Sequence, residues 1–126
     1  MVGIVIVSHS RQIASGAAEL AGQMAGPDVR IESAGGDVDG GLGTDGARVR
    51  SAIERADSGE GVVILGDLGS AILTVRAVLD GDSATARLAD APLVEGAVAA
   101  AVAASAGVDL ELVVRAAEEA RGYSKL

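Results

Sequence analysis

The sequence contains no cysteine and only one histidine, His9. Without cysteine, the chain can form neither a disulfide nor a thiolate metal site. A zinc site in this chain would have to consist mostly of carboxylates, which is unusual for zinc. We therefore expect no metal centre.

Aromatic residues make up 1% of the chain, whereas hydrophobic residues make up 49%. The core must therefore consist of Val, Ile, Leu and Ala side chains. A length of 126 residues suits one domain, which we expect over residues 1–121, followed by a C-terminal tail over residues 122–126. Small side chains leave little room for a large internal cavity, so we expect the functional site at the rim of the fold.

Basic residues are also few, with 10 against 18 acidic residues and a formal charge of −8. This charge repels nucleic acid and anionic membranes, and it suits a protein steered toward a basic partner surface. The apolar N-terminal segment lacks the basic region and cleavage site of a signal peptide. Residues 92–108 contain Glu95 and are too rich in alanine to form a convincing membrane span. We expect a cytoplasmic protein that binds neither nucleic acid nor membrane.

Short apolar runs rich in β-branched residues alternate with segments of helical periodicity, as in βαβ units. The expected strands are Gly3–Val7, Val29–Ser33, Gly61–Leu65 and Ala84–Ala89. The first and third are continuously apolar, as central strands are, and the other two resemble edge strands. We therefore expect an α/β fold: a three-layer open sheet of about four mainly parallel strands, in the order 2-1-3-4, with helices on both faces.

The intervening segments show apolar residues at helical spacing. The expected buried faces are Ile13, Ala17, Leu20 and Met24 in the first helix, Val49, Ile53 and Ala56 in the second, and Ile72, Val75, Val78 and Leu79 in the third, with Ser70 as its N-cap. Two further helices are expected over residues 93–105 and 109–121. The first of these is rich in alanine and includes Val94, Val98 and Val102, and it could either cover the sheet or form a dimer contact.

Right-handed crossovers place all strand-to-helix loops at the carboxyl edge of the sheet. If the first and third strands are neighbours, His9 and Asp67 lie at adjacent strand ends. A carboxylate on one ring nitrogen fixes the tautomer of the imidazole and makes the other nitrogen more nucleophilic. The glycine-rich loops and Ser70, at a helix N-terminus, offer hydrogen-bond donors to an anion. These loops predict a histidine that carries a phosphoryl group, although each residue alone also fits ordinary turn chemistry.

Other motifs are weak or absent. Residues 41–46 fit the pattern G-x-G-x-x-G, but a long loop separates them from the preceding strand, whereas the dinucleotide fingerprint needs a tight turn. Asp37 and Asp39 are more typical of solvated loop acids than of cation ligands. Three alternatives stay open: a flavodoxin-like module that binds a small anion or nucleotide without covalent chemistry, a hydrolase that uses His9 and Asp67 with a serine, and a structural dimerisation domain. The sequence has no nucleophile elbow for the hydrolase.

Four segments together resemble a known family: residues 3–10 (GIVIVSHS), the Ala-Gly-Gly…Gly-Thr loop of residues 34–44, residues 66–71 (GDLGSA) and residues 92–97 (PLVEGA). They resemble the phosphotransfer subunit of the phosphoenolpyruvate-dependent dihydroxyacetone kinase, within the mannose-type IIA superfamily of the sugar phosphotransferase system. The resemblance extends over essentially the whole chain, in the right order. A sugar-transporter IIA component of the mannose type is an alternative, but Leu68-Gly69-Ser70-Ala71 looks like the kinase branch.

The resemblance implies a phosphotransferase subunit with no tightly bound cofactor, only a transient phosphoryl group on His9. His9 would accept this group from the histidine phosphocarrier protein and pass it to ADP on the nucleotide-binding subunit of the kinase. A third subunit would then phosphorylate dihydroxyacetone (glycerone). Members of the family are typically homodimers, so a homodimer is expected here.

The resemblance also assigns roles to residues at the strand ends. Asp67 would match the carboxylate that orients the active histidine. The phosphate surroundings would be Ser10, Gly43, Thr44, Gly69 and Ser70. The sequence departs from the family at Asp45, where relatives often carry serine. A carboxylate there would repel phosphate unless it points away, for instance by capping the second helix.

Overall fold

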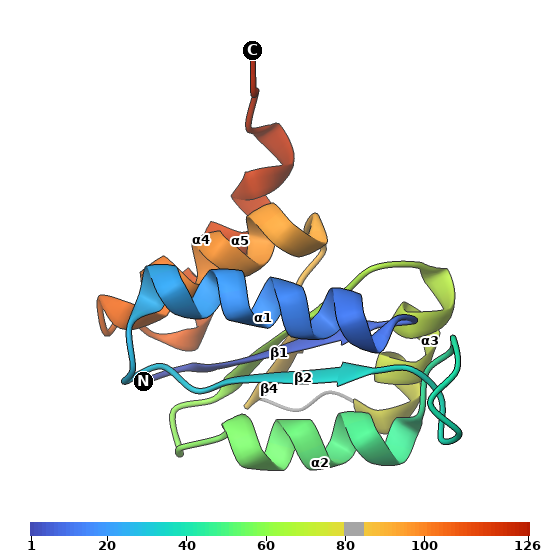
Figure 1. The fold of residues 1–126 in the computed structure, drawn as a ribbon. Helices are drawn as coiled ribbons and strands as arrows, with labels where there is room; N and C mark the ends of the chain where they lie inside the picture. The colour runs from blue at the N-terminus through green and yellow to red at the C-terminus, as the bar shows by residue number, and fades with distance from the viewer. Residues whose placement is uncertain (80–84) are drawn as a thin grey trace.

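The computed structural model describes residues 1–79 and 85–126, which form a four-stranded sheet between two layers of helices (Figure 1). The strand order is β2-β1-β3-β4 and every neighbouring pair is parallel, as the sequence predicted. The strands are β1 (Gly3–Ser8), β2 (Ile31–Gly35), β3 (Val62–Gly66) and β4 (Ala86–Leu88). The helices are α1 (Arg11–Ala25), α2 (Gly46–Ala56), α3 (Gly69–Leu79), α4 (Leu93–Ser105) and α5 (Leu110–Glu119), followed by the short 3₁₀ helix η1 (Ala120–Gly122).

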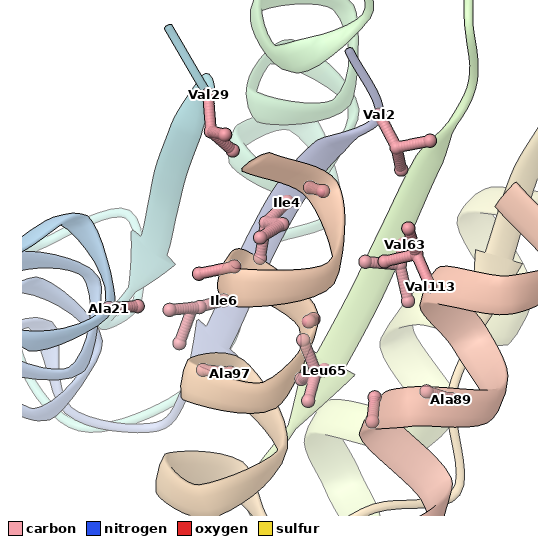
Figure 2. Close-up of a cluster of buried hydrophobic side chains, with 14 of the residues drawn as sticks. Val2, Ile4, Ile6, Ala21, Val29, Val63, Leu65, Ala89, Ala97 and Val113 are labelled. Atoms are coloured by element: carbon pink, nitrogen blue, oxygen red, sulfur yellow. The ribbon is translucent and has the colours of Figure 1, made fainter. Parts of the chain in front are cut away.

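Every residue of β1 and β3 is buried, because helices cover both faces of these central strands. On one face, Ile4, Ile6, Val63 and Leu65 pack against α1, α4 and α5, as Figure 2 shows for part of this cluster. On the other face, a second buried cluster joins β1 and β3 to α2 and α3. Its members from β1 and β3 are Val5, Val7, Val62 and Ile64. The helices packed on both faces therefore hold the carboxyl edge of the sheet in place.

The predicted buried face of α1 is wrong except at Ala17. Ile13, Leu20 and Met24 are 52%, 43% and 57% exposed. The buried residues are Ala14, Ala17 and Ala21. They lie in the same core cluster as the alanine-rich face of α4. Where two helices pack closely, small side chains are favoured over larger and more hydrophobic ones, because larger side chains would hold the helices apart.

All four predicted strands differ from the observed ones in their bounds. The first ends at Ser8 rather than Val7, and the third spans Val62–Gly66 rather than Gly61–Leu65. The second was expected over Val29–Ser33 but forms at Ile31–Gly35, because Val29 is buried in the core without joining the ladder. The fourth spans Ala86–Leu88, and position 84 of its expected range lies outside the described residues.

The helix α4 has one of the two roles that the sequence left open for it, that of covering the sheet. Its small residues face the core, whereas Val94 and Val102 are exposed. The alanine face thus covers the sheet, and the valines lie on the outer side. In the part of the chain that the structure describes, no helix has both the length and the apolar character needed to cross a membrane.

Candidate functional site

The carboxyl ends of β1 and β3 lie side by side, with Val7 in register with Gly66. The next residues along each chain bring His9 and Asp67 together, as the predicted strand order required. The Nδ1 atom of His9 lies 3.0 Å from Oδ1 of Asp67. The two side chains are 24% and 15% exposed, so the pair is accessible from the rim while largely shielded from water.

The carboxylate of Asp67 accepts hydrogen bonds from four groups. The buried Ser8 hydroxyl donates to Oδ2 at 2.6 Å, and the backbone N–H of His9 donates to the same oxygen at 3.2 Å. The backbone N–H of Leu68 donates to Oδ1 at 2.7 Å, beside the His9 ring. Burial acts to raise the pKa of Asp67, but these hydrogen bonds, led by those from Ser8 and the His9 ring, outweigh it and hold the pKa below its usual value. Asp67 is therefore a carboxylate at neutral pH.

The ionised state of Asp67 determines which nitrogen of His9 carries the proton. A carboxylate can only accept, so Nδ1 must donate to it. In the neutral ring, Nε2 then has a free lone pair. The Ser70 hydroxyl contacts Nε2 and serves as its hydrogen-bond donor. The arrangement presents Nε2 as a nucleophile at the rim of the sheet.

The N-terminus of α3 lies beside this nitrogen. The first intrahelical hydrogen bond of α3 runs from the N–H of Ile72 to the carbonyl of Leu68. The preceding amides, those of Gly69, Ser70 and Ala71, therefore have no acceptor within the helix, and such amides form the usual anion site at a helix N-terminus. The helix begins at Gly69, so Ser70 lies in its first turn and is not its N-cap, contrary to the expectation.

Gly43 and Thr44 are linked to the site by hydrogen bonds to neighbouring residues. The N–H of Gly43 donates to the His9 carbonyl at 2.9 Å, which ties the glycine-rich loop to β1. The Thr44 hydroxyl lies 2.7 Å from the Thr74 hydroxyl, which itself donates to the carbonyl of Ser70 at 2.9 Å. Because Thr74 has only one hydroxyl proton, Thr44 must be the donor in their mutual bond. Gly43 thus holds the loop against the segment that follows β1, and Thr44 holds it against α3.

Ser10 and Asp45 cap helices. The Ser10 hydroxyl accepts from the N–H of Ile13 at 3.3 Å at the start of α1, and the backbone N–H of Ser10 donates to Ser8 Oγ at 3.0 Å. The Asp45 carboxylate accepts from the N–H of Ala47 at 3.1 Å at the start of α2. Asp45, the position at which the sequence was expected to depart from the family it resembles, therefore caps α2 with its carboxylate.

Asp37 closes the glycine-rich loop. Its Oδ1 atom accepts from the N–H groups of Asp39 at 2.9 Å and of Gly41 at 2.8 Å. Among the described residues, no three His, Asp or Glu side chains are grouped so that they could hold a metal ion. The Asp37 carboxylate thus fixes the backbone conformation of this loop.

The roles of two residues of the site were not predicted from the sequence. Ser8 is the one buried polar residue among those described, and it braces Asp67. The register of the first and third strands could have found it, since the residue after Val7 stands beside the residue after Gly66. Thr74 lies one turn after Ser70, the spacing at which a threonine hydroxyl bonds back to a helix carbonyl.

Comparison with known proteins gives a consistent result. The sequence profile of the family described as "PTS system fructose IIA component" (EIIA-man) matches residues 3–114. The "PEP-dependent dihydroxyacetone kinase, phosphoryl donor subunit DhaM" of Pantoea ananatis is 43% identical over 127 residues, which cover 95% of this chain and 27% of the relative. The protein of the same description from Escherichia coli K12 is 40% identical over 121 residues, 90% of this chain and 26% of the relative. The "PEP-dependent dihydroxyacetone kinase 2, phosphoryl donor subunit DhaM" of Listeria innocua is 42% identical over 106 residues, 81% of this chain and 85% of the relative.

The chain thus spans about a quarter of the length of the Pantoea and Escherichia relatives and most of the length of the Listeria relative. Among solved structures, the crystal structure of a protein of unknown function, EF1359, superposes with a TM-score of 0.78. The two sequences are 38% identical, and the match covers 94% of each chain.

Proposed function

The chain belongs to the mannose-type IIA family of the phosphotransferase system, whose sequence profile it matches over residues 3–114, and we propose that it is a phosphohistidine carrier with the phosphoryl group on His9. The observation that carries this proposal is the geometry of the single histidine. Its Nδ1 atom is held by an ionised Asp67, and its Nε2 atom faces the N-terminus of α3.

In the first transfer, the Nε2 lone pair attacks the phosphorus atom of the donor phosphohistidine. The P–N bond of the donor breaks, its electron pair returns to the donor imidazole, and a P–Nε2 bond forms. No proton leaves His9, because Nδ1 keeps its proton and the new positive charge of the ring lies against Asp67. In the second transfer, an oxygen of the acceptor attacks phosphorus, and Nε2 regains its electron pair.

The groups around Nε2 suit the charge of a phosphoryl group. The Ser70 hydroxyl, which contacts Nε2 in the free protein, can turn its proton to a phosphoryl oxygen instead. The amides of Gly69 and Ser70 at the start of α3 add donors and the positive end of the helix dipole. Gly43, Thr44 and Ser10 support this arrangement through the loops they hold. Phosphoryl transfer depends mainly on such positioning and charge stabilisation.

We further infer the partners from the named relatives, which are phosphoryl donor subunits of dihydroxyacetone kinases. The donor would be the histidine phosphocarrier protein, and the acceptor would be ADP on the nucleotide-binding subunit of the kinase. We also infer that the chain forms a homodimer. A IIA component of a sugar transporter is the second candidate, since the matched family is described by that role.

The test is the intact mass of the protein after incubation with phosphoenolpyruvate, enzyme I and the histidine phosphocarrier protein at neutral to alkaline pH. We expect one added phosphoryl group that is labile in acid and absent from the variant His9→Gln. Because His9 is the only histidine, this variant removes every imidazole from the chain. If an active, cognate donor set adds no mass, the protein is not a carrier.

The branch of the family is tested by the acceptor. Addition of the ADP-loaded kinase subunit should discharge the phosphorylated protein and form ATP. Discharge only by a sugar-transporter IIB protein would assign the chain to the transporter branch. Saturable binding of a nucleotide at His9 without any mass change would favour the non-covalent binding module instead.

A further inference from the structure

Arginine and serine side chains gather in a cleft along the outer edge of β2, although the chain has a net charge of −8. The cleft has a volume of about 270 Å³ and lies between α1 and α2, which flank β2 in Figure 1. We call it the β2-edge cleft, and its lining residues are Arg11, Ser15, Ser33, Ala34, Gly35, Arg48, Ser51 and Arg55. None of these eight residues is acidic.

The strand itself supplies backbone donors to the cleft. The N–H of Ile4 donates to the carbonyl of Arg30, and the N–H of Gly36 donates to that of Ser8. Even-numbered residues of this segment therefore direct their backbone groups toward β1. Because these directions alternate along a strand, the N–H groups of Ser33 and Gly35 point to the outer edge. The sheet ends at β2 in the part of the chain that is described, so no strand pairs with them there.

The three guanidinium groups differ in how they are held. Arg55 donates from Nε to Glu32 at 2.6 Å and from Nη1 to Ser51 at 2.7 Å, which fixes its position and leaves other N–H groups free. Arg48 lies 3.7 Å from the Asp45 carboxylate, which is longer than a hydrogen bond.

Arg11 has no ion-pair partner among the described residues. Three guanidinium groups thus lie at this cleft beside two carboxylates, those of Glu32 and Asp45. The net charge of these five groups is positive. A planar guanidinium group donates two parallel hydrogen bonds to a phosphate group, which makes arginine the preferred residue for such ligands.

We propose that the β2-edge cleft binds the phosphate or diphosphate group of a small anion at a site separate from His9. The His9 ring turns toward Asp67 and Ser70, on the β3 side of β1, whereas the cleft lies on the β2 side. The volume falls just below the usual range for small-molecule sites. It accommodates one or two phosphate groups and leaves an attached nucleoside outside. This binding does not require phosphoryl transfer by His9.

The test is an NMR titration of the ¹⁵N-labelled chain with inorganic pyrophosphate. We expect saturable shifts of the Ser33 and Gly35 amide signals. The variant Arg11→Gln removes a guanidinium group that has no ion pair among the described residues, and it should weaken binding at least fivefold. Arg115→Gln is the matched control, since Arg115 is exposed on α5 and also has no ion pair in the described part of the chain. If both variants weaken binding equally, only the overall charge matters and the proposal is wrong.

Further titrations identify the source of the phosphate group. ADP that binds like pyrophosphate, while adenosine does not bind, would support a diphosphate site that leaves the nucleoside outside. The variant His9→Gln should give the same titration as the natural chain. Loss of binding in this variant would show that the anion binds at His9 instead, and it would overturn the proposal. Shifts with a glutamate-rich peptide but with no phosphate compound would also overturn it, in favour of a docking site for an acidic protein segment. Absence of shifts with inorganic phosphate, pyrophosphate and ADP would rule out the site.

Discussion

At the residue scale, the Asp67 carboxylate joins the end of β1 to the start of the loop before α3. Two of its hydrogen bonds come from side chains, Ser8 and His9, and two from backbone amides. The same bonds that stabilise its charge also orient the imidazole. In the proposed function, phosphoryl transfer and local stability therefore both depend on this carboxylate, and experiment can separate the two.

Asp67→Asn tests the role of this charge in transfer. Asparagine keeps the shape of the side chain, but its NH₂ group can face the ring and draw the proton to Nε2, which removes the nucleophilic lone pair. We expect the rate of His9 phosphorylation to fall by about a hundredfold or more. The initial rate from intact-protein mass measures this, with the exposed Asp90→Asn as the control. A rate within twofold of the natural chain would remove Asp67 from the mechanism.

The lowered pKa of Asp67 predicts how it contributes to stability across pH. Because its folded pKa lies below the ordinary value of 3.8, its contribution is fully present above that value and is lost as the pH falls through the folded pKa. We expect a difference in urea midpoint between the natural chain and Asp67→Asn at pH 5, which lies above the ordinary pKa of the carboxyl. It should shrink below about pH 4. A difference independent of pH down to pH 2.5 would contradict the assigned shift.

At the element scale, the chain of hydroxyls from Thr44 through Thr74 to the Ser70 carbonyl couples the glycine-rich loop to α3. This contact joins a loop and a helix that are far apart in the sequence. It positions Ser70, whose hydroxyl meets Nε2 of His9. Thr74 is therefore a positioning residue that acts on the site from one helical turn away.

Thr74→Val removes the hydroxyl and keeps the shape. We expect the free energy of unfolding to fall by about 1 kcal/mol, the net value of a hydrogen bond, and the phosphorylation rate to fall several-fold. Chemical denaturation and the intact-mass assay measure the two effects. Thr74→Ser should restore both, and a failure of serine to restore the rate would show that the hydroxyl is not what matters.

The sequence predicted the strand order and the meeting of His9 with Asp67, because continuous apolar runs mark central strands and parallel strands share one carboxyl edge. It did not predict the buried face of α1. Apolar periodicity weighs Ile13 and Leu20 above Ala14, yet the space between α1 and α4 admits only alanine. The contact of Ser8 with Asp67 was not predicted either, because the sequence presents Ser8 only as part of the polar segment after the first strand, and its burial follows from the register with β3.

At the scale of the whole molecule, an apolar groove runs between α4, α5 and the C-terminal segment. It has a volume of about 560 Å³, and its lining includes Val94, Val98, Val102 and Tyr123. Exposed apolar surface of this kind marks protein interfaces. It supports the homodimer that we infer from the family.

Val102→Glu tests this interface. A carboxylate placed in the apolar groove would lose its hydration on association, so we expect the variant to be a monomer at micromolar concentration. Light scattering coupled to size-exclusion chromatography measures the mass. Leu112→Glu is the control, since Leu112 is similarly exposed on α5 but does not line the groove. A monomeric natural chain would refute the homodimer directly.

The net charge of −8 acts over the whole surface. If the donor presents a basic face, the attraction speeds encounter and is screened by salt. We expect kcat/KM for phosphorylation of His9 to fall steeply between 50 and 500 mM NaCl, while the rate at saturating donor changes little. Rates that do not depend on salt would show that the charge plays no part in encounter.

The shortage of aromatic rings has a practical consequence for spectroscopy. The chain has no tryptophan or phenylalanine, so His9 and Tyr123 alone produce its aromatic proton signals. One ring lies at the proposed transfer site and the other lines the apolar groove. An unlabelled sample should therefore report phosphorylation through the His9 resonances and subunit association through those of Tyr123, in one spectrum and without substitution of any residue.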